Sequence, residues 1–138
     1  MNADSGCRIL GWAEAETLFA GTLGIAPVEL ARFDSPHYLE RSRIASWEKL
    51  SDHAIFRRLE APSSLLGTVG VVSELSYARD LGVFLVEGRF LNDFVDGYLD
   101  RYGECLFSGG DTFFIFSQEN LLLFFHHSGF IFRYRLPL

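Results

Sequence analysis

Three aspartates are the side chains whose type and spacing best suit chemistry in this chain. Asp93, Asp96 and Asp100 recur at intervals of three and four residues, which places them on one face of a helix. No basic residue separates them, Arg101 follows directly, and Glu104 lies just beyond. Since no histidine joins the row, we expect an anionic face that docks a basic partner rather than a metal site. The same pattern also occurs on ordinary solvated helix faces.

Two adjacent histidines, His126 and His127, are the other neighbouring groups with metal-ligand chemistry. Because successive side chains of a strand point to opposite faces, we expect these two not to bind one cation together. The remaining histidines, at positions 37 and 53, have no ligand spacing. The sequence therefore predicts no metal and no cofactor.

Nucleophilic catalysis has little support in the sequence. Cys105 lies in an apolar run, and we expect its thiol to be buried and inert. No nucleophile elbow, metalloprotease motif or phosphate loop occurs, and the Gly-rich segments 67–70 and 108–111 are typical of turns. We predict that the protein is not an enzyme. With only Cys7 as a second cysteine, no disulfide framework is expected.

Length, composition and net charge limit the classes of partner that the chain could bind. A chain of 138 residues fits one domain, and a net charge of −6 argues against nucleic acid while suiting a basic protein. No apolar stretch is long enough to span a membrane or to act as a signal peptide, so we predict a cytoplasmic protein that contacts no membrane. Lys49 is the single lysine beside the arginines, as expected for a GC-rich bacterial genome.

The N-terminal part of the chain, about 10–60, is predicted to be helical. Apolar residues keep helical spacing over 12–23, Gly24 is a natural stop, and a short helix is predicted for 27–33. Residues 38–60 are expected to be largely helical, with a cap at Ser51.

For the remainder of the chain, about 65–136, we predict strands at 65–75 and 83–86, an amphipathic helix at 90–102, and an antiparallel meander. The meander strands are expected at 104–107, 112–116, 121–127 and 130–135. The two middle strands of this meander are apolar on both sides, so a second layer should cover them, and helix 90–102 is the natural cover. The fold class is therefore α+β: an N-terminal helical region, then a β-meander with a packed helix, in a single domain over 1–138.

Trp47 is the most prominent aromatic residue in the charged region 38–60. Exposed Trp, Tyr and Arg are common at interface hot spots, and Tyr38 and several arginines lie nearby in the sequence. Trp47 is therefore a candidate anchor for a partner, with burial in the core as the alternative.

The segment 83–136 resembles the C-terminal half of small immunity proteins encoded beside bacterial polymorphic toxins. The resemblance lies in an apolar strand, an acidic helix, the run Gly103-Glu-Cys-Leu-Phe107, a Gly/Asp turn and an aromatic hairpin ending His-His-Ser-Gly. Leu23–Leu30 is similar to the opening of a second immunity-type family. The resemblance implies a non-enzymatic cytosolic inhibitor that binds a cognate toxin, and it assigns no contact residues.

These observations together favour a binding protein, namely an immunity protein or antitoxin that occludes the active site of a toxin with a basic surface. The contact residues we predict are Asp93, Asp96, Asp100, Glu104 and Trp47. One alternative is a small-molecule-binding or enzymatic domain with a pocket against the aromatic sheet, for which the candidates are His126 or His127, Tyr134 and Cys105. Another is a structural subunit of a larger assembly.

Overall fold

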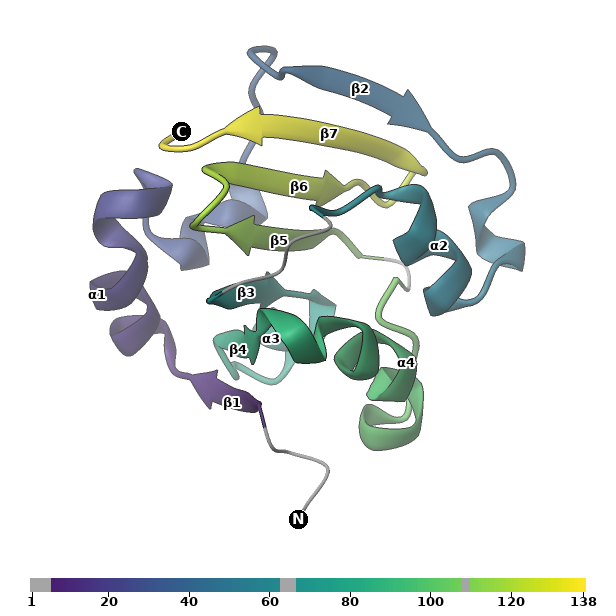
Figure 1. Cartoon of the computed structure of the whole chain (residues 1–138), viewed down its shortest axis with the longest axis horizontal. Coiled ribbons are helices and arrows are strands. Elements are labelled where there is room, and N and C mark those ends of the chain that lie inside the picture. Colours follow the sequence, from purple (N-terminus) through teal and green to yellow (C-terminus); the bar gives the residue numbers. More distant parts are fainter. Residues whose placement is uncertain (1–5, 63–66, 108–109) are drawn as a thin grey trace.

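A seven-stranded antiparallel sheet organises the chain, with its strands in the order β1-β4-β3-β5-β6-β7-β2 (Figure 1). The computed structural model describes residues 6–62, 67–107 and 110–138. The strands are β1 (Cys7–Leu10), β2 (Glu40–Arg43), β3 (Thr68–Val72), β4 (Val83–Glu87), β5 (Thr112–Phe116), β6 (Leu121–Phe125) and β7 (Phe130–Arg135). The helices are α1 (Trp12–Leu23), α2 (Asp52–Arg58), α3 (Glu74–Ala78) and α4 (Leu91–Tyr102), with short 3-10 turns η1 (Pro27–Arg32), η2 (Trp47–Lys49) and η3 (Gly88–Phe90).

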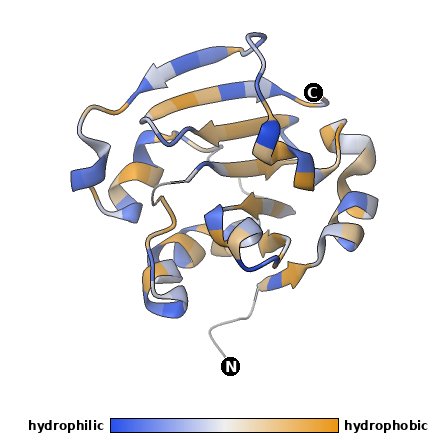
Figure 2. Cartoon of the chain, turned by 180° about the vertical axis from the view of Figure 1, so that it is seen from behind, coloured by the Kyte–Doolittle hydropathy of each residue, from blue (hydrophilic) through white to orange (hydrophobic). Residues whose placement is uncertain are grey.

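Two apolar layers enclose the central strands, and this arrangement confirms the α+β class. Successive residues of β5 separate into the two layers: Phe113 packs with α1 and η1, whereas Phe114 packs with α2 and α4. The expected cover of the meander by helix 90–102 is therefore present as α4, and α1 covers the other face. Figure 2 shows the apolar residues concentrated in these central strands. No helix within the described residues is both long and apolar enough to cross a lipid bilayer.

The prediction of a helical N-terminal part was wrong at residues 40–43. Helix α1 and turn η1 form where predicted, and Ser51 caps α2 by accepting a hydrogen bond from the Ala54 N–H at 3.2 Å. However, β2 is a strand, and it forms one edge of the sheet by pairing with β7. The other edge is β1, which lies before the predicted helical part and pairs with β4. Every residue of β2 is exposed, so no apolar periodicity marks this strand in the sequence. It is held by backbone pairing with β7 and by the guanidinium groups of Arg41 and Arg43, which lie over the ring of Phe130.

Two further predictions in the second half of the chain were also wrong. Residues 104–107 do not form a strand, because the backbone N–H groups of Leu106 and Phe107 donate to the side chain of Asp52 instead of to a neighbouring strand. Helix α3 begins at Glu74, inside the stretch 65–75 that was predicted to be a strand. The predicted turn at 108–111 lies partly outside the described residues. Strands β5, β6 and β7 form the predicted meander, but β6 ends at Phe125, before the two histidines.

The charged side of β7 has a structural role. The guanidinium of Arg133 reaches across to α2 and donates to the carbonyl oxygens of Leu59 and Glu60 at 3.0 and 3.2 Å. A cation at this position satisfies carbonyl groups that the end of a helix leaves unpaired. Arg133 therefore fastens the C-terminus of α2 to the sheet.

Candidate functional site

Helix α4 presents the predicted row of acids to solvent. Asp93, Asp96 and Asp100 are exposed, while the opposite face of the helix buries Leu91, Phe94, Val95 and Tyr98. Gly103 ends the helix with φ of 80°, and Glu104 follows in a half-buried position. The structure thus brings the four predicted acidic residues to one helix and its C-terminal turn.

A histidine from α2 joins this row, a contact that was not predicted from the sequence. Nδ1 of His53 lies 2.8 Å from Oδ1 of Asp96, and both side chains are half exposed. Charge on His53 depends on protonation of its imidazole, so the pair is an ion pair in one state and a neutral hydrogen bond in the other. A separation of 43 residues between the two positions explains why spacing along the sequence could not reveal the contact.

A recess of about 380 Å³ lies between α2 and α4, directly beside the acids. Val95 and Leu99 give it apolar walls, and Leu99 is 48% exposed. The remaining lining residues are Ser51, Asp52, His53, Asp96 and Cys105. An apolar surface rimmed by carboxylates is a suitable seat for a long cationic side chain, whose methylene stem is apolar and whose head is charged.

Asp52 lines this recess and holds part of its wall in place. Its side chain is 9% exposed, and its two oxygens accept hydrogen bonds from the backbone N–H groups of Leu106 and Phe107 at 2.7 and 3.1 Å. These bonds fold the segment after α4 back against α2, which sets the positions of Glu104 and Cys105. The sequence indicated Asp52 only as part of a helix start.

Cys105 corrects one expectation, since it is exposed rather than buried. Partial desolvation raises the pKa of its thiol, and the negative charges of Asp52 and Glu104 raise it further. A thiol must ionise before it acts as a nucleophile, and no described hydrogen bond connects Cys105 with His53. The Cys, His and Asp side chains around this recess therefore lack the arrangement of a nucleophilic triad.

Trp47 lies apart from the acids in its described contacts. Its ring is half-buried and meets Phe125 edge-on, with centroids 5.3 Å apart, and it also covers Gly129 in the turn between β6 and β7. This position corresponds to the alternative that Trp47 belongs to the core. Its role as a contact residue stays a prediction.

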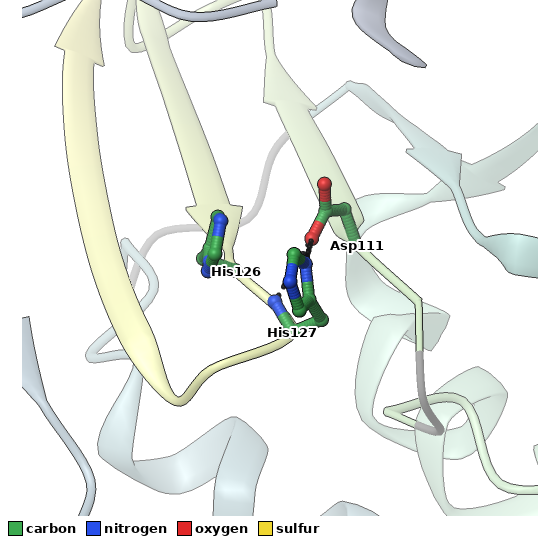
Figure 3. Close-up of side chains that lie close together, drawn as sticks. All are labelled: Asp111, His126 and His127. Atoms are coloured by element: carbon green, nitrogen blue, oxygen red, sulfur yellow. Dashed lines mark hydrogen bonds and ion pairs between the residues drawn. The ribbon is translucent and has the colours of Figure 1, made fainter. Parts of the chain in front are cut away.

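The second polar cluster contains the two adjacent histidines and corrects another expectation. His126 and His127 do not point to opposite faces, because β6 ends one residue earlier and the chain enters a turn. Their ring centroids lie 4.0 Å apart, and Asp111 joins them from the start of β5 (Figure 3). His126 is half-buried and His127 exposed, so neither sits in the core.

Beside this cluster lies an open hollow of about 400 Å³ against the aromatic side of β6 and β7. Its walls are Phe124, Phe132 and Tyr134 from the sheet, residues 31–35 at and after the end of η1, and Asp111 and His126. The Tyr134 hydroxyl donates to the carbonyl oxygen of Ser35 at 2.7 Å. Burial raises the pKa of Tyr134, and the nearby Asp34 and Tyr38 raise it further.

Comparison with known proteins identifies no relative. No protein-family model, curated protein or solved structure matches the chain. Function must therefore be inferred from the two surfaces themselves.

Proposed function

We propose that this protein is a non-enzymatic binding protein, an immunity protein or antitoxin that neutralises a cognate toxin by occluding its active site. The observation that carries this proposal is the exposed row of Asp93, Asp96 and Asp100 beside an apolar recess. The resemblance of segment 83–136 to immunity proteins supports the same class. The partner implied by this surface is a protein with a basic, partly apolar contact site.

Binding would proceed in two stages. The row of carboxylates draws a basic protein to this face, and such steering raises association rates by roughly 10- to 1,000-fold at low ionic strength. An arginine or lysine of the toxin then lays its stem on Leu99 and sets its charged head among the carboxylates. Burial of that side chain supplies the apolar contact that holds the complex together.

A charge-reversal experiment tests the proposal. The partner is the product of the neighbouring gene, co-purified with this chain and then used in association kinetics. The triple variant D93K/D96K/D100K should slow association by about tenfold or more and flatten its dependence on salt. The matched control E14K/E16K/E29K makes the same change in net charge at exposed residues of α1 and η1. Equal association rates for the two triple variants would refute a role for the α4 face.

The aromatic hollow favours a second candidate, a small-molecule-binding domain. Concave sites with aromatic walls and a few converging polar groups are typical of ligand pockets, and about 400 Å³ falls in their range. A ligand that binds the folded state raises its melting temperature. In a thermal-shift screen, a hit in this hollow should stabilise the native chain, and a Phe132→Ala variant should lose the shift.

A further inference from the structure

We propose that Asp111, His126 and His127 form a binding site for a divalent transition-metal ion of the zinc class. This site is independent of the proposed toxin binding, because its residues lie just beyond the paired ends of β5 and β6 and none of them belongs to the α4 face. One donor atom from each of the three side chains lies within 4.8 Å of the other two. Within the described ranges, no second group of three such ligands lies as close together.

The sheet register brings the three residues together. Thr112 and Phe125 are the last paired residues at this end of β5 and β6, so Asp111 and His126 occupy the next positions on neighbouring strands. The turn then forms through hydrogen bonds between His126 and Phe130 and between Gly129 and His126. It places the His127 ring beside that of His126 instead of across the sheet, with 30° between the ring planes.

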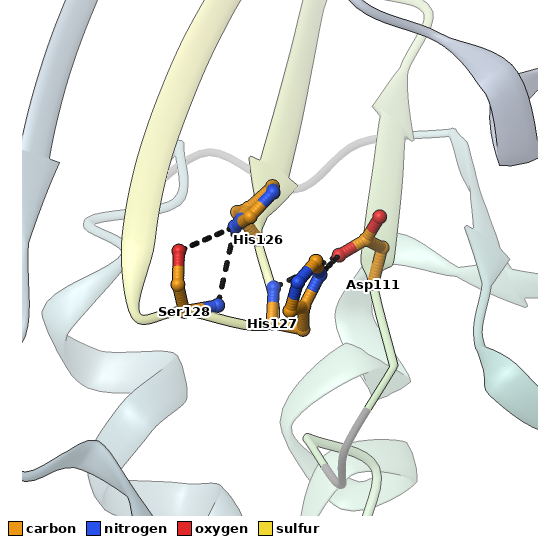
Figure 4. Close-up of polar contacts among 4 residues, drawn as sticks. All are labelled: Asp111, His126, His127 and Ser128. Carbon is orange, nitrogen blue, oxygen red and sulfur yellow. Dashed lines mark hydrogen bonds and ion pairs between the residues drawn. The ribbon is translucent and has the colours of Figure 1, made fainter.

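Hydrogen bonds already orient both imidazoles (Figure 4). Oδ1 of Asp111 accepts from the His127 backbone N–H at 2.8 Å and lies 2.9 Å from Nδ1 of the same residue. Nδ1 of His126 lies 2.6 Å from Oγ of Ser128 and 3.1 Å from the Ser128 backbone N. In His126 this leaves Nε2 for a metal, an arrangement characteristic of metal-bound histidines. In His127 a metal bound to both side chains takes the place of the proton between Nδ1 and Oδ1 of Asp111, which face each other at 2.9 Å.

The contacts of Ser128 also determine which tautomer of His126 could bind a metal. A backbone N–H can only donate, so its contact with Nδ1 belongs to the metal-free ring. When Nε2 binds a cation, Nδ1 carries the proton and donates to Oγ of Ser128, a bond for which the 2.6 Å separation is already suitable. Ser128 is therefore a positioning residue for this site.

The dimensions and the donor types select the metal. Bonds of about 2.0–2.2 Å to nitrogen and oxygen place tetrahedral ligand atoms about 3.3–3.5 Å apart. Donor atoms that lie up to 4.8 Å apart must therefore move closer by little more than about 1 Å. Such a movement is feasible because 55% of the His127 side chain and 28% of the Asp111 side chain are exposed. Two imidazoles and one carboxylate favour Zn²⁺, Co²⁺, Ni²⁺ or Cu²⁺ over Mg²⁺ and Ca²⁺, which prefer oxygen ligands.

Three protein ligands leave further coordination positions open, as in catalytic zinc sites rather than closed structural ones. Asp111 and His126 also line the aromatic hollow. The open positions are thus accessible to an anionic or nitrogen-containing group that enters the hollow, or to water in its absence.

Titration of the untagged, metal-stripped chain with Co²⁺ tests the site, with Zn²⁺ as competitor. We expect one Co²⁺ per chain, visible absorption bands of low-coordinate cobalt, and loss of these bands on addition of Zn²⁺. Loss of the hydrogen-bond partner of a metal ligand costs about 10- to 100-fold in metal affinity, so Ser128→Ala should fall in that range. His127→Asn and Asp111→Asn should each cost more than about 100-fold, since they remove a ligand.

His53→Asn is the matched control. His53 makes the same kind of contact to an aspartate, at 2.8 Å, but lacks a third donor within the same range among the described residues. Its variant should bind Co²⁺ like the native chain. Binding without defined stoichiometry, or equal losses in His53→Asn and His127→Asn, would overturn the proposal and leave a hydrogen-bonded cluster only.

A measurement on the native chain covers the case in which the ligand variants fold poorly. Bound Co²⁺ shifts and broadens the NMR signals of nearby nuclei. The affected amides should be those of residues 111 and 126–128. Effects centred on residues 53 and 96 would refute the assignment.

Discussion

The buried carboxylate of Asp52 should be among the most important polar groups for the stability of this protein. It stands in the first turn of α2 and accepts two backbone N–H groups from the segment after α4. A hydrogen bond to a charged group contributes about 1.5–3 kcal/mol, and a carboxylate at the start of a helix contributes about 0.3–1 kcal/mol more. Replacement by alanine removes both bonds and leaves two buried donors without an acceptor.

We therefore expect Asp52→Ala to lower the free energy of unfolding by about 3–5 kcal/mol, a large part of the roughly 5–15 kcal/mol that natural domains possess. Asp52→Asn keeps one acceptor oxygen but turns an NH₂ group toward an N–H donor, so about 1.5–3 kcal/mol should be lost. Urea unfolding followed by tryptophan fluorescence measures both values.

Asp93→Ala is the control, because this carboxylate is exposed and a surface change usually alters stability by less than about 0.5 kcal/mol. The Asp52 variants should also label faster at Cys105, since the loop that carries this thiol loses its attachment. A loss below about 1 kcal/mol in Asp52→Ala would refute the view that these two bonds hold the loop.

Four further predictions concern packing, a hydrogen bond and titration. Gly97→Ala should stabilise the protein by about 0.5–1 kcal/mol, because a methyl group there meets nothing within 4 Å. Gly70→Ala should instead cost about 1–3 kcal/mol, since its Cβ would lie 2.8 Å from Cζ of Phe19; a gain in urea unfolding would contradict this packing. Arg133→Ala should lower stability by about 1–3 kcal/mol and fray the end of α2, which hydrogen exchange can detect and which unchanged protection would disprove. Burial raises the pKa of Tyr98 above its ordinary value of 10.0. Its contribution to the free energy of unfolding is therefore complete below pH 10 and is lost as the pH rises further. Tyr98→Phe should flatten this alkaline decline when unfolding is measured against pH, and an equal slope in the variant would count against it.

Local patterns predicted the elements whose own residues determine them. Helices α1 and α4 follow from apolar spacing, and β5 and β7 from apolar runs between turns. The acidic row on α4 was predictable for the same reason, since a helix fixes the relation of its own side chains.

The features that local patterns did not predict depend on contacts between segments distant in the sequence. The edge strand β2 has no buried residue to mark it, and residues 104–107 lose their strand because of Asp52, more than 50 positions earlier. The exposure of Cys105 follows from that loop. The pairing of His126 with His127 depends on where β6 ends, and an alternating strand pattern cannot indicate that.

The order of strands in the sheet has a consequence for synthesis of the chain. Both edge strands come from the first third of the sequence, yet β1 pairs with β4, and β2 pairs with β7 near the C-terminus. A nascent chain therefore emerges with its outer strands unpaired, and the β2 edge closes only after β7 has been synthesised. Pairings this distant in sequence are slow to form, and unpaired strands favour association between incomplete chains. The charged residues of β2 are well suited to protect the chain during that interval.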